Sequence, residues 1–179
     1  MSAVIHASVQ MELTPDASAR LRADMSPQTA VQELLAAGQA QDALKLLARL
    51  MPKRYAVAWL CQCARDQPLS QEDRIGASLA EQWVREPSES NRRAAFEFAH
   101  AGGYRALGAW IAAAAGWSGG SLAPASQETP VPPAEHLTAR ATVAAINLMA
   151  ALDATQFEAR RTSYIERAMS LLQAGGSEP

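Results

Sequence analysis

Residues 52–65 read PKRYAVAWLCQCAR, and between Tyr55 and Ala64 almost every position is apolar. Proline suits the first position of a helix, and a helix that is apolar all round lies in the middle of a core. This segment is therefore predicted to be a central core helix. Cys61 and Cys63 lie two positions apart, so their side chains would point in different directions along a helix. We expect two buried apolar thiols and neither a disulfide nor a shared metal.

Further helix signals flank this segment on both sides. Ser26 and Pro27 suit the N-cap and first position of a helix, and Gly38 suits its end. Ser70 and Ser88 are N-cap candidates farther along the chain. The predicted helices cover residues 26–38, 40–51, 52–65, 70–86, 88–101, 104–116 and 137–152, with a last apolar stripe over 157–172.

No segment has the alternation of a strand, so the predicted fold is all-α. We expect one compact domain of about seven to eight helices over residues 26–175, preceded by a loose N-terminal arm over residues 1–25. Ile75, Leu79 and Trp83 repeat every four residues and predict one buried stripe. The large side chains expected in the core are Trp59, Leu79, Trp83 and Trp110.

Composition excludes several classes of protein. The chain has 179 residues, of which 49% are hydrophobic and 19% charged, and this content of apolar side chains can form a core. Sixteen basic residues nearly balance eighteen acidic ones, which gives no electrostatic case for a nucleic-acid or membrane partner. The start lacks a secretory pattern, and the most apolar run, 106–117, is shorter than the roughly 20 residues that span a bilayer. We therefore expect a cytoplasmic protein.

A long irregular segment, residues 117–136, follows the sixth predicted helix, and we call it the strap. Prolines recur along it, and only Glu128 and Glu135 are charged. Loops of this length inside a domain are uncommon and often functional. We expect an ordered strap with Trp117 facing inward and Val131-Pro132-Pro133 lying in a groove between helices.

Gly116 to Gly120 match the G-x-S-x-G pattern of a hydrolase nucleophile, with Ser118 as the serine. That pattern works where a strand turns sharply into a helix, whereas a helix precedes it here. Ser118 is therefore not expected to be catalytic. Metal-ligand and phosphate- or dinucleotide-binding motifs are also missing, so no metal and no cofactor is predicted.

Arg92 and Arg93 lie in the first turn of a predicted helix, where the helix dipole disfavours cations. A carboxylate such as Glu89, three residues earlier, would compensate that charge. A role in binding is the alternative to this structural interpretation.

Three groups of residues, taken in order, resemble an uncharacterised family of bacterial all-helical proteins over most of the chain from Ser26 onward. They are 54–61 with 63–65, 83–89 with 91–95, and 117–124 with 131–133 and 136–141. Proteins of this family look like companions of type VI secretion genes, near spike proteins and the adaptors that load effectors. The resemblance implies an accessory or adaptor role rather than a reaction.

From this resemblance we expect a non-catalytic adaptor that binds a protein partner, either a secretion spike, an effector or another adaptor. An immunity protein that neutralises a toxin is the first alternative, and a hydrolase using Ser118 is the second. The residues that this chain shares with the family are apolar residues, glycine, proline and arginine, and this set suits a binding surface. The binding residues predicted are Arg92, Arg93, Trp117, Ser118, Gly119, Gly120, Val131, Pro132, Pro133 and His136.

Overall fold

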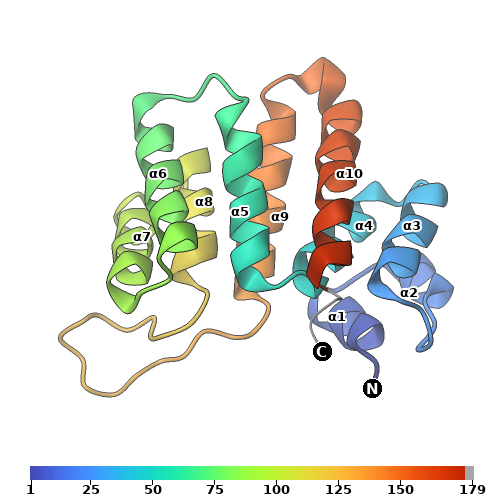
Figure 1. The fold of residues 1–179 in the computed structure, drawn as a ribbon, viewed down its shortest axis with the longest axis horizontal. Coiled ribbons are helices and arrows are strands. Elements are labelled where there is room, and N and C mark those ends of the chain that lie inside the picture. Colours follow the sequence, from blue (N-terminus) through green and yellow to red (C-terminus); the bar gives the residue numbers. More distant parts are fainter. Residues whose placement is uncertain (176–179) are drawn as a thin grey trace. The chain divides into compact units, whose positions relative to one another are not determined.

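Helices are the only regular elements in residues 1–175, the part of the chain that the computed structural model describes (Figure 1). Their bounds are α1 Ala3–Gln10, α2 Pro15–Arg20, α3 Pro27–Ala36, α4 Ala40–Leu50, α5 Lys53–Arg65, α6 Gln71–Arg85, α7 Glu89–Ala101, α8 Leu107–Gly116, α9 Leu137–Ala151, the 3-10 helix η1 Ala154–Gln156 and α10 Phe157–Gly175. The all-α class is confirmed. The described residues hold ten α-helices, more than the seven to eight expected, because the N-terminal segment is also helical.

The contacts within the chain group it into two compact units. One consists of Met1–Pro52 together with residues 150–175, and the other of Lys53–Met149. The strap and its flanking helices α7 and α8 belong to the second unit. That 26–175 forms a single domain stays a prediction.

The N-terminal segment is not the loose arm expected from the sequence. Residues 3–10 and 15–20 form α1 and α2, and Met11 between them is only 2% exposed. Asp42 on α4 accepts hydrogen bonds from both the amide (3.0 Å) and the hydroxyl (2.9 Å) of Thr14, which also caps α2. Helices of eight and six residues are too short to show a clear period, and a contact with α4 holds them in place.

In the second unit, α8 is the most completely buried helix. Every one of its residues except Trp110 is buried. Glycines let its neighbours approach closely, since a Cβ built on Gly76 of α6 would lie 2.2 Å from the Gly108 carbonyl oxygen. A Cβ on Gly116 would lie 2.6 Å from Cα of Phe96 on α7. Small residues on α8 therefore allow α6 and α7 to pack almost backbone to backbone.

The predicted core is confirmed in part. Trp59 is fully buried in α5 and Trp83 is 7% exposed, whereas Leu79 and Trp110 are half-buried. The α6 stripe is shifted by one position, because Gly76 and Ala80 face inward while Ile75 is 47% exposed. The close approach of Gly76 to α8 accounts for this rotation of α6.

Candidate functional site at the strap

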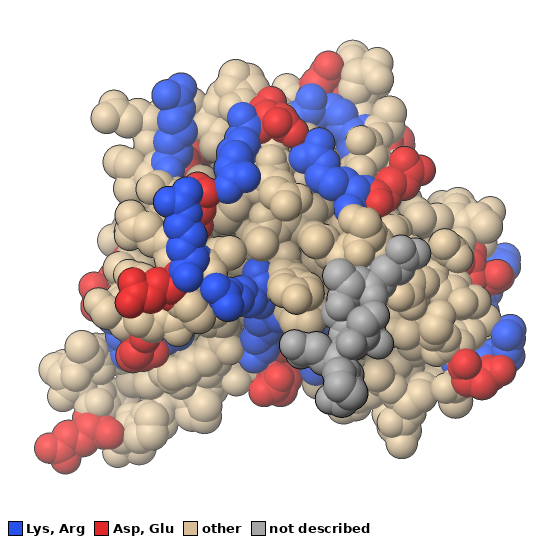
Figure 2. Space-filling model, viewed as in Figure 1, with Lys and Arg blue, Asp and Glu red and all other residues tan. Residues whose placement is uncertain are grey.

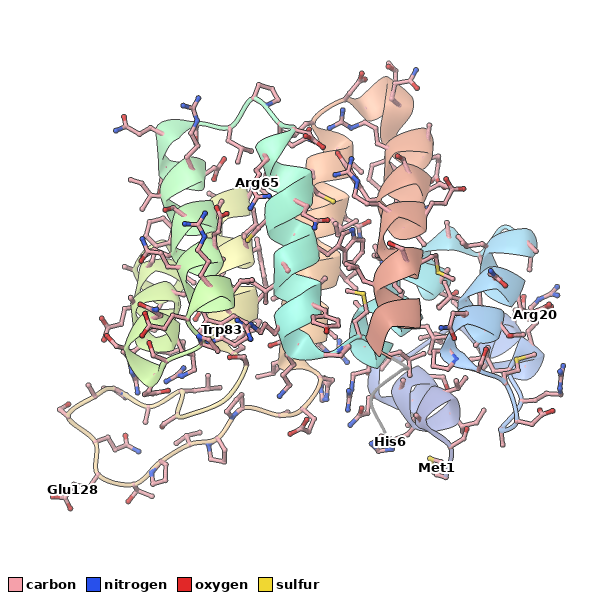
Figure 3. All side chains as sticks on the ribbon, viewed as in Figure 1. Met1, His6, Arg20, Arg65, Trp83 and Glu128 are labelled. Atoms are coloured by element: carbon pink, nitrogen blue, oxygen red, sulfur yellow. The ribbon has the colours of Figure 1, made fainter. Side chains whose placement is uncertain are left out.

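The strap leaves α8 at Trp117 and returns to the chain at α9, and Figure 1 shows that it extends away from the helices of its unit. Two hydrogen bonds close its outer part into a ring: Leu122 N–H donates to the Val131 carbonyl at 2.8 Å, and Val131 N–H donates to Ser121 Oγ at 2.9 Å. We call residues 122–131 the lobe. Glu128 lies at its outer end (Figure 3). The lobe is thus a defined loop that is held mainly at its base.

Arg92 fastens the start of the strap. Only 3% of this residue is exposed, and its Nη1 donates to the Gly116 carbonyl at 2.6 Å while Nη2 reaches the Ser121 carbonyl at 3.3 Å. Nε and Nη2 also donate to the two carboxylate oxygens of Glu89 at 2.7 and 2.6 Å. This bidentate pair compensates the buried charge and holds the pKa of Glu89 below its usual range. The predicted Glu89–Arg92 pairing is confirmed.

Gly120 lies directly against the Arg92 guanidinium. A Cβ at this position would lie 2.6 Å from Nε of Arg92, and the residue has φ +64°, which favours glycine. Gly120 therefore leaves room for the Arg92 guanidinium, which any side chain at this position would displace. Gly119 beside it faces open space.

Two further basic side chains hold the strap at other points. Arg93 donates to the Ala123 carbonyl at 2.8 Å and lies over the Phe96 ring, 5.4 Å from its centroid. Lys53, at the start of α5, donates to the Ser118 carbonyl at 3.0 Å and is 3.5 Å from the Glu135 carboxylate. Arg92, Arg93 and Lys53 therefore act on backbone carbonyls of the strap, at positions on either side of Gly120.

Aromatic packing forms the root of the strap. Trp117 contacts Tyr104, with ring centroids 5.3 Å apart, and Trp110, with centroids 5.9 Å apart. Trp117 is half-buried, so its expected inward packing is confirmed. Tyr104 adopts a left-handed backbone conformation (φ 55°), which places its ring between the two tryptophans and His100.

The second half of the strap differs from the expectation. Val131 is 46% exposed, Pro132 is exposed and Pro133 is half-buried, so these residues do not lie in a groove between helices. The reason is that the Val131 amide donates to Ser121 and its carbonyl accepts from Leu122, so both of its backbone hydrogen bonds are made within the strap. His136 is half-buried just before α9, and its carbonyl accepts the amide of Arg140.

Six of the ten predicted site residues separate into two sets. Arg92, Arg93, Trp117 and Gly120 build the attachment of the strap, whereas Val131 and Pro132 are presented on its outside. Sequence reasoning missed Lys53 and Ser121. One signal was available for Lys53, because the chain has only two lysines and this one follows a proline at a helix start.

Ser118 is the second residue beyond the end of α8 and lies at the start of the strap. A nucleophile elbow joins a strand to a helix, whereas Ser118 leaves a helix for a loop, and its carbonyl accepts from Lys53. Within residues 1–175, no group of three or more histidine, cysteine or acidic side chains could hold a metal ion.

A hollow of about 300 Å³ lies between α7 and the base of the lobe. Phe96, Leu122 and Pro124 supply apolar lining, and Arg93, Glu97 and His100 add polar groups. His100 stacks on Phe96 with centroids 5.9 Å apart. The hollow has the size and mixture of surfaces that accept one large side chain.

The described residues thus define an all-helical protein with a long loop fastened by buried and half-buried cations. The chain belongs to DUF6931, a family of unknown function whose pattern matches residues 30–172. No curated protein and no solved structure matches the chain. Among the helices described, none is by itself long and apolar enough to cross a membrane, and α9 and α10 reach the necessary length only when counted together as one broken segment.

Proposed function

We propose that this protein is a non-catalytic adaptor that acts in the cytoplasm and binds a protein partner through the lobe of the strap. The partner proposed is a component of type VI secretion, either a spike protein, an effector or another adaptor. The resemblance of the three sequence groups to companions of type VI secretion genes supports this choice of partner. A protein, rather than nucleic acid or a membrane, suits a chain whose basic and acidic residues nearly balance.

One observation carries the proposal: the buried side chain of Arg92 fixes the chain just before the lobe, while the outer face of the lobe is left exposed. From inside the unit, Arg92 donates to the Gly116 carbonyl at the end of α8 and to the Ser121 carbonyl of the strap. Val131 nevertheless exposes 46% of its surface next to two prolines, Pro130 and Pro132. Exposed apolar side chains on a loop with restricted backbone freedom lose little entropy when they bind. This arrangement favours recognition over catalysis.

The hollow between α7 and the lobe gives the partner an anchor point. Its apolar residues Phe96 and Leu122 would contact an apolar or aromatic side chain of the partner. Arg93 at its edge would remain bonded to Ala123, so the hollow would keep its shape during binding. Interfaces commonly centre on one such filled pocket.

The test is a co-purification of the tagged protein from its native host, followed by mass spectrometry. We expect spike, effector or adaptor proteins of type VI secretion to be recovered with the wild-type chain. Val131→Glu should abolish their recovery, because it places a charge on the exposed face of the lobe. Ile75→Glu is the matched control, since Ile75 is 47% exposed on α6, close to the 46% of Val131.

Each outcome distinguishes the alternatives. Recovery of a single toxin would replace the adaptor proposal by the immunity alternative. Equal recovery with Val131→Glu and with the wild-type chain would show that the lobe is not the binding surface. Labelling of Ser118 by a fluorophosphonate probe would replace both the adaptor proposal and the immunity alternative by the hydrolase alternative.

A further inference from the structure

A second hollow, of about 360 Å³, lies between α5 and α6 and shares no lining residue with the hollow under the lobe. Its apolar surface comes from Cys61, Ala64, Leu69 and Ala77. The Cys61 thiol donates weakly to the Ala77 carbonyl, and burial raises its pKa to about 12. The thiol is therefore neutral at physiological pH, and this side of the hollow is uncharged.

The edge of the same hollow carries an excess of positive charge. Arg65 and Arg74 line it together with one carboxylate, Glu81. Glu81 pairs with Arg65, and also with Arg85 at 3.1 Å, so its charge is already compensated by these two guanidinium groups. Figure 3 shows Arg65 between α5 and α6, and Figure 2 shows several basic side chains on this face. The hydrogen bond from Arg65 lowers the pKa of Glu81, so this carboxylate stays charged at neutral pH and keeps its two arginine partners.

The guanidinium of Arg74 is held at the edge of the hollow. Its Nε donates to the Leu69 carbonyl at 3.1 Å, and Leu69 itself lines the apolar surface. A guanidinium fixed through Nε presents its two terminal nitrogens in one plane, and this fork matches the two oxygens of a carboxylate. An anion at Arg74 would therefore lie next to apolar surface.

We propose that this hollow is a binding site for a carboxylate carried on a short aliphatic group. The carboxylate binds Arg74 and Arg65, and the aliphatic group packs on Cys61, Leu69 and Ala77. The volume is near the lower end of the range for ligand sites, which limits the ligand to a small acid or to the last residue of a peptide. This site is separate from the strap and does not depend on the function proposed for it.

The test uses the full chain, labelled with ¹⁵N, titrated with sodium hexanoate and observed by amide chemical shifts. For a ligand of this size we expect a Kd on the order of 1 mM, with the shifted amides concentrated in 61–81. Hexanamide has the same aliphatic group without the charge, and we expect it to cause no saturable shift. Equal binding of hexanamide, or no saturable shift with hexanoate, would overturn the proposal.

Two variants test the two halves of the site. Arg74→Gln should raise the Kd for hexanoate about tenfold by removing the charged fork. Ala77→Leu should abolish binding, because the larger side chain fills the apolar part of the hollow and leaves the charges in place. Arg22→Gln is the control, since Arg22 is an exposed arginine paired with Asp24 outside this unit. Loss of binding in Arg22→Gln equal to that in Arg74→Gln would mean nonspecific attraction and would overturn the proposal.

A second titration distinguishes the two sources of the same chemistry. A short peptide that ends in leucine with a free carboxylate is compared with its C-terminal amide. Tighter binding of the acid peptide than of hexanoate would assign the site to the C-terminus of another protein. Tighter binding of hexanoate would assign it to a free small acid, and a peptide amide that binds as well as its acid would contradict the site.

Discussion

Asp73 of α6 caps a different helix: its Oδ1 accepts a hydrogen bond from the backbone amide of Gly108, in the first turn of α8, at 2.8 Å. The N-cap residue of α8 itself, Ala106, makes no side-chain cap. The first amides of a helix have no partner within it, and α8 is the most buried helix of its unit. Asp73, which lies 35 positions before Gly108 in the chain, therefore supplies the capping acceptor that Ala106 cannot provide.

Asp73→Ala should lower the free energy of unfolding by about 1–2 kcal/mol, the usual effect of losing a cap. Glu72→Ala is the matched control, because Glu72 is the exposed acidic neighbour in the same turn of α6. Both variants lose one acidic charge near the α6 N-terminus, but only Asp73→Ala leaves the Gly108 amide without its acceptor. Urea denaturation measures the difference, and equal losses in the two variants would contradict the capping role.

Gly116→Ala should cost about 1–3 kcal/mol, because the added methyl group would lie 2.6 Å from Cα of Phe96 and would separate α7 from α8. Gly119→Ala, three residues later, should change stability by less than about 0.5 kcal/mol, since nothing lies within 4 Å of the new Cβ. Urea midpoints of the two variants provide the comparison. A Gly116→Ala variant as stable as the wild type would show that α7 and α8 can move apart at little cost.

Arg92→Met should loosen the strap while leaving the helices folded. The Gly116 and Ser121 carbonyls would lose their donor, and the peptide bond before Leu122 should become accessible. Thermolysin digestion followed by mass spectrometry should show faster cleavage at Leu122 than in the wild type. Arg85→Met, at an exposed arginine of α6, is the control and should leave this rate unchanged. Unaltered cleavage in Arg92→Met would assign the strap's order to other contacts.

The Glu89–Arg92 pair should make stability depend on pH in the acid range. Arg92 lowers the pKa of Glu89 below its ordinary value of 4.5, so the folded state binds the proton less tightly than the unfolded state. The contribution of the pair is therefore complete above pH 4.5 and is lost as the pH falls through the lower folded pKa. Urea midpoints followed downward from neutral pH should decline less in Glu89→Gln than in the wild type. Glu97→Gln, on the same helix, is the comparison, and identical slopes for all three proteins would contradict the pairing.

Cys61 should resist alkylation in the folded protein. Its pKa is raised to about 12 by burial, so the fraction of reactive thiolate at pH 8 is very small. Labelling with iodoacetamide should proceed at the rate of unfolding and accelerate in urea in parallel with the loss of helical signal. Rapid labelling in buffer alone would mean that the Cys61 thiol ionises more readily than its burial implies.

The helix boundaries could be predicted where a local signal sets them. Ser26, Ser70 and Ser88 accept from amides three residues ahead, and Gly38 has φ +74° at the end of α3. The rotation of α6 could not be predicted, because it depends on the backbone contact of Gly76 with Gly108. A stripe of apolar residues indicates which face is buried only when the helix packs through side chains.

The attachment of the strap could likewise be predicted only where it depends on residues close together in the sequence. The Glu89–Arg92 pair spans three residues of one helix and follows from spacing alone. The bonds from Arg92 to Gly116 and Ser121 depend instead on the path of a loop 24 to 29 residues away. The exposure of Val131 was missed for a related reason, since its pairing with Ser121 occurs within the loop and carries no periodic pattern.

The hydrogen bonds between Ser121, Leu122 and Val131 close the base of the lobe, and Arg93 of α7 holds Ala123 beside that base. Residues 124–130 are all exposed, so a change in their number is absorbed beyond the closed ring and does not alter the spacing between α8 and α9. Lengthening such a closed loop is inexpensive, about 0.6 kcal/mol for each doubling. Residues 125–130 can therefore change in length without altering the helical scaffold, and an epitope or a fluorophore can be inserted there.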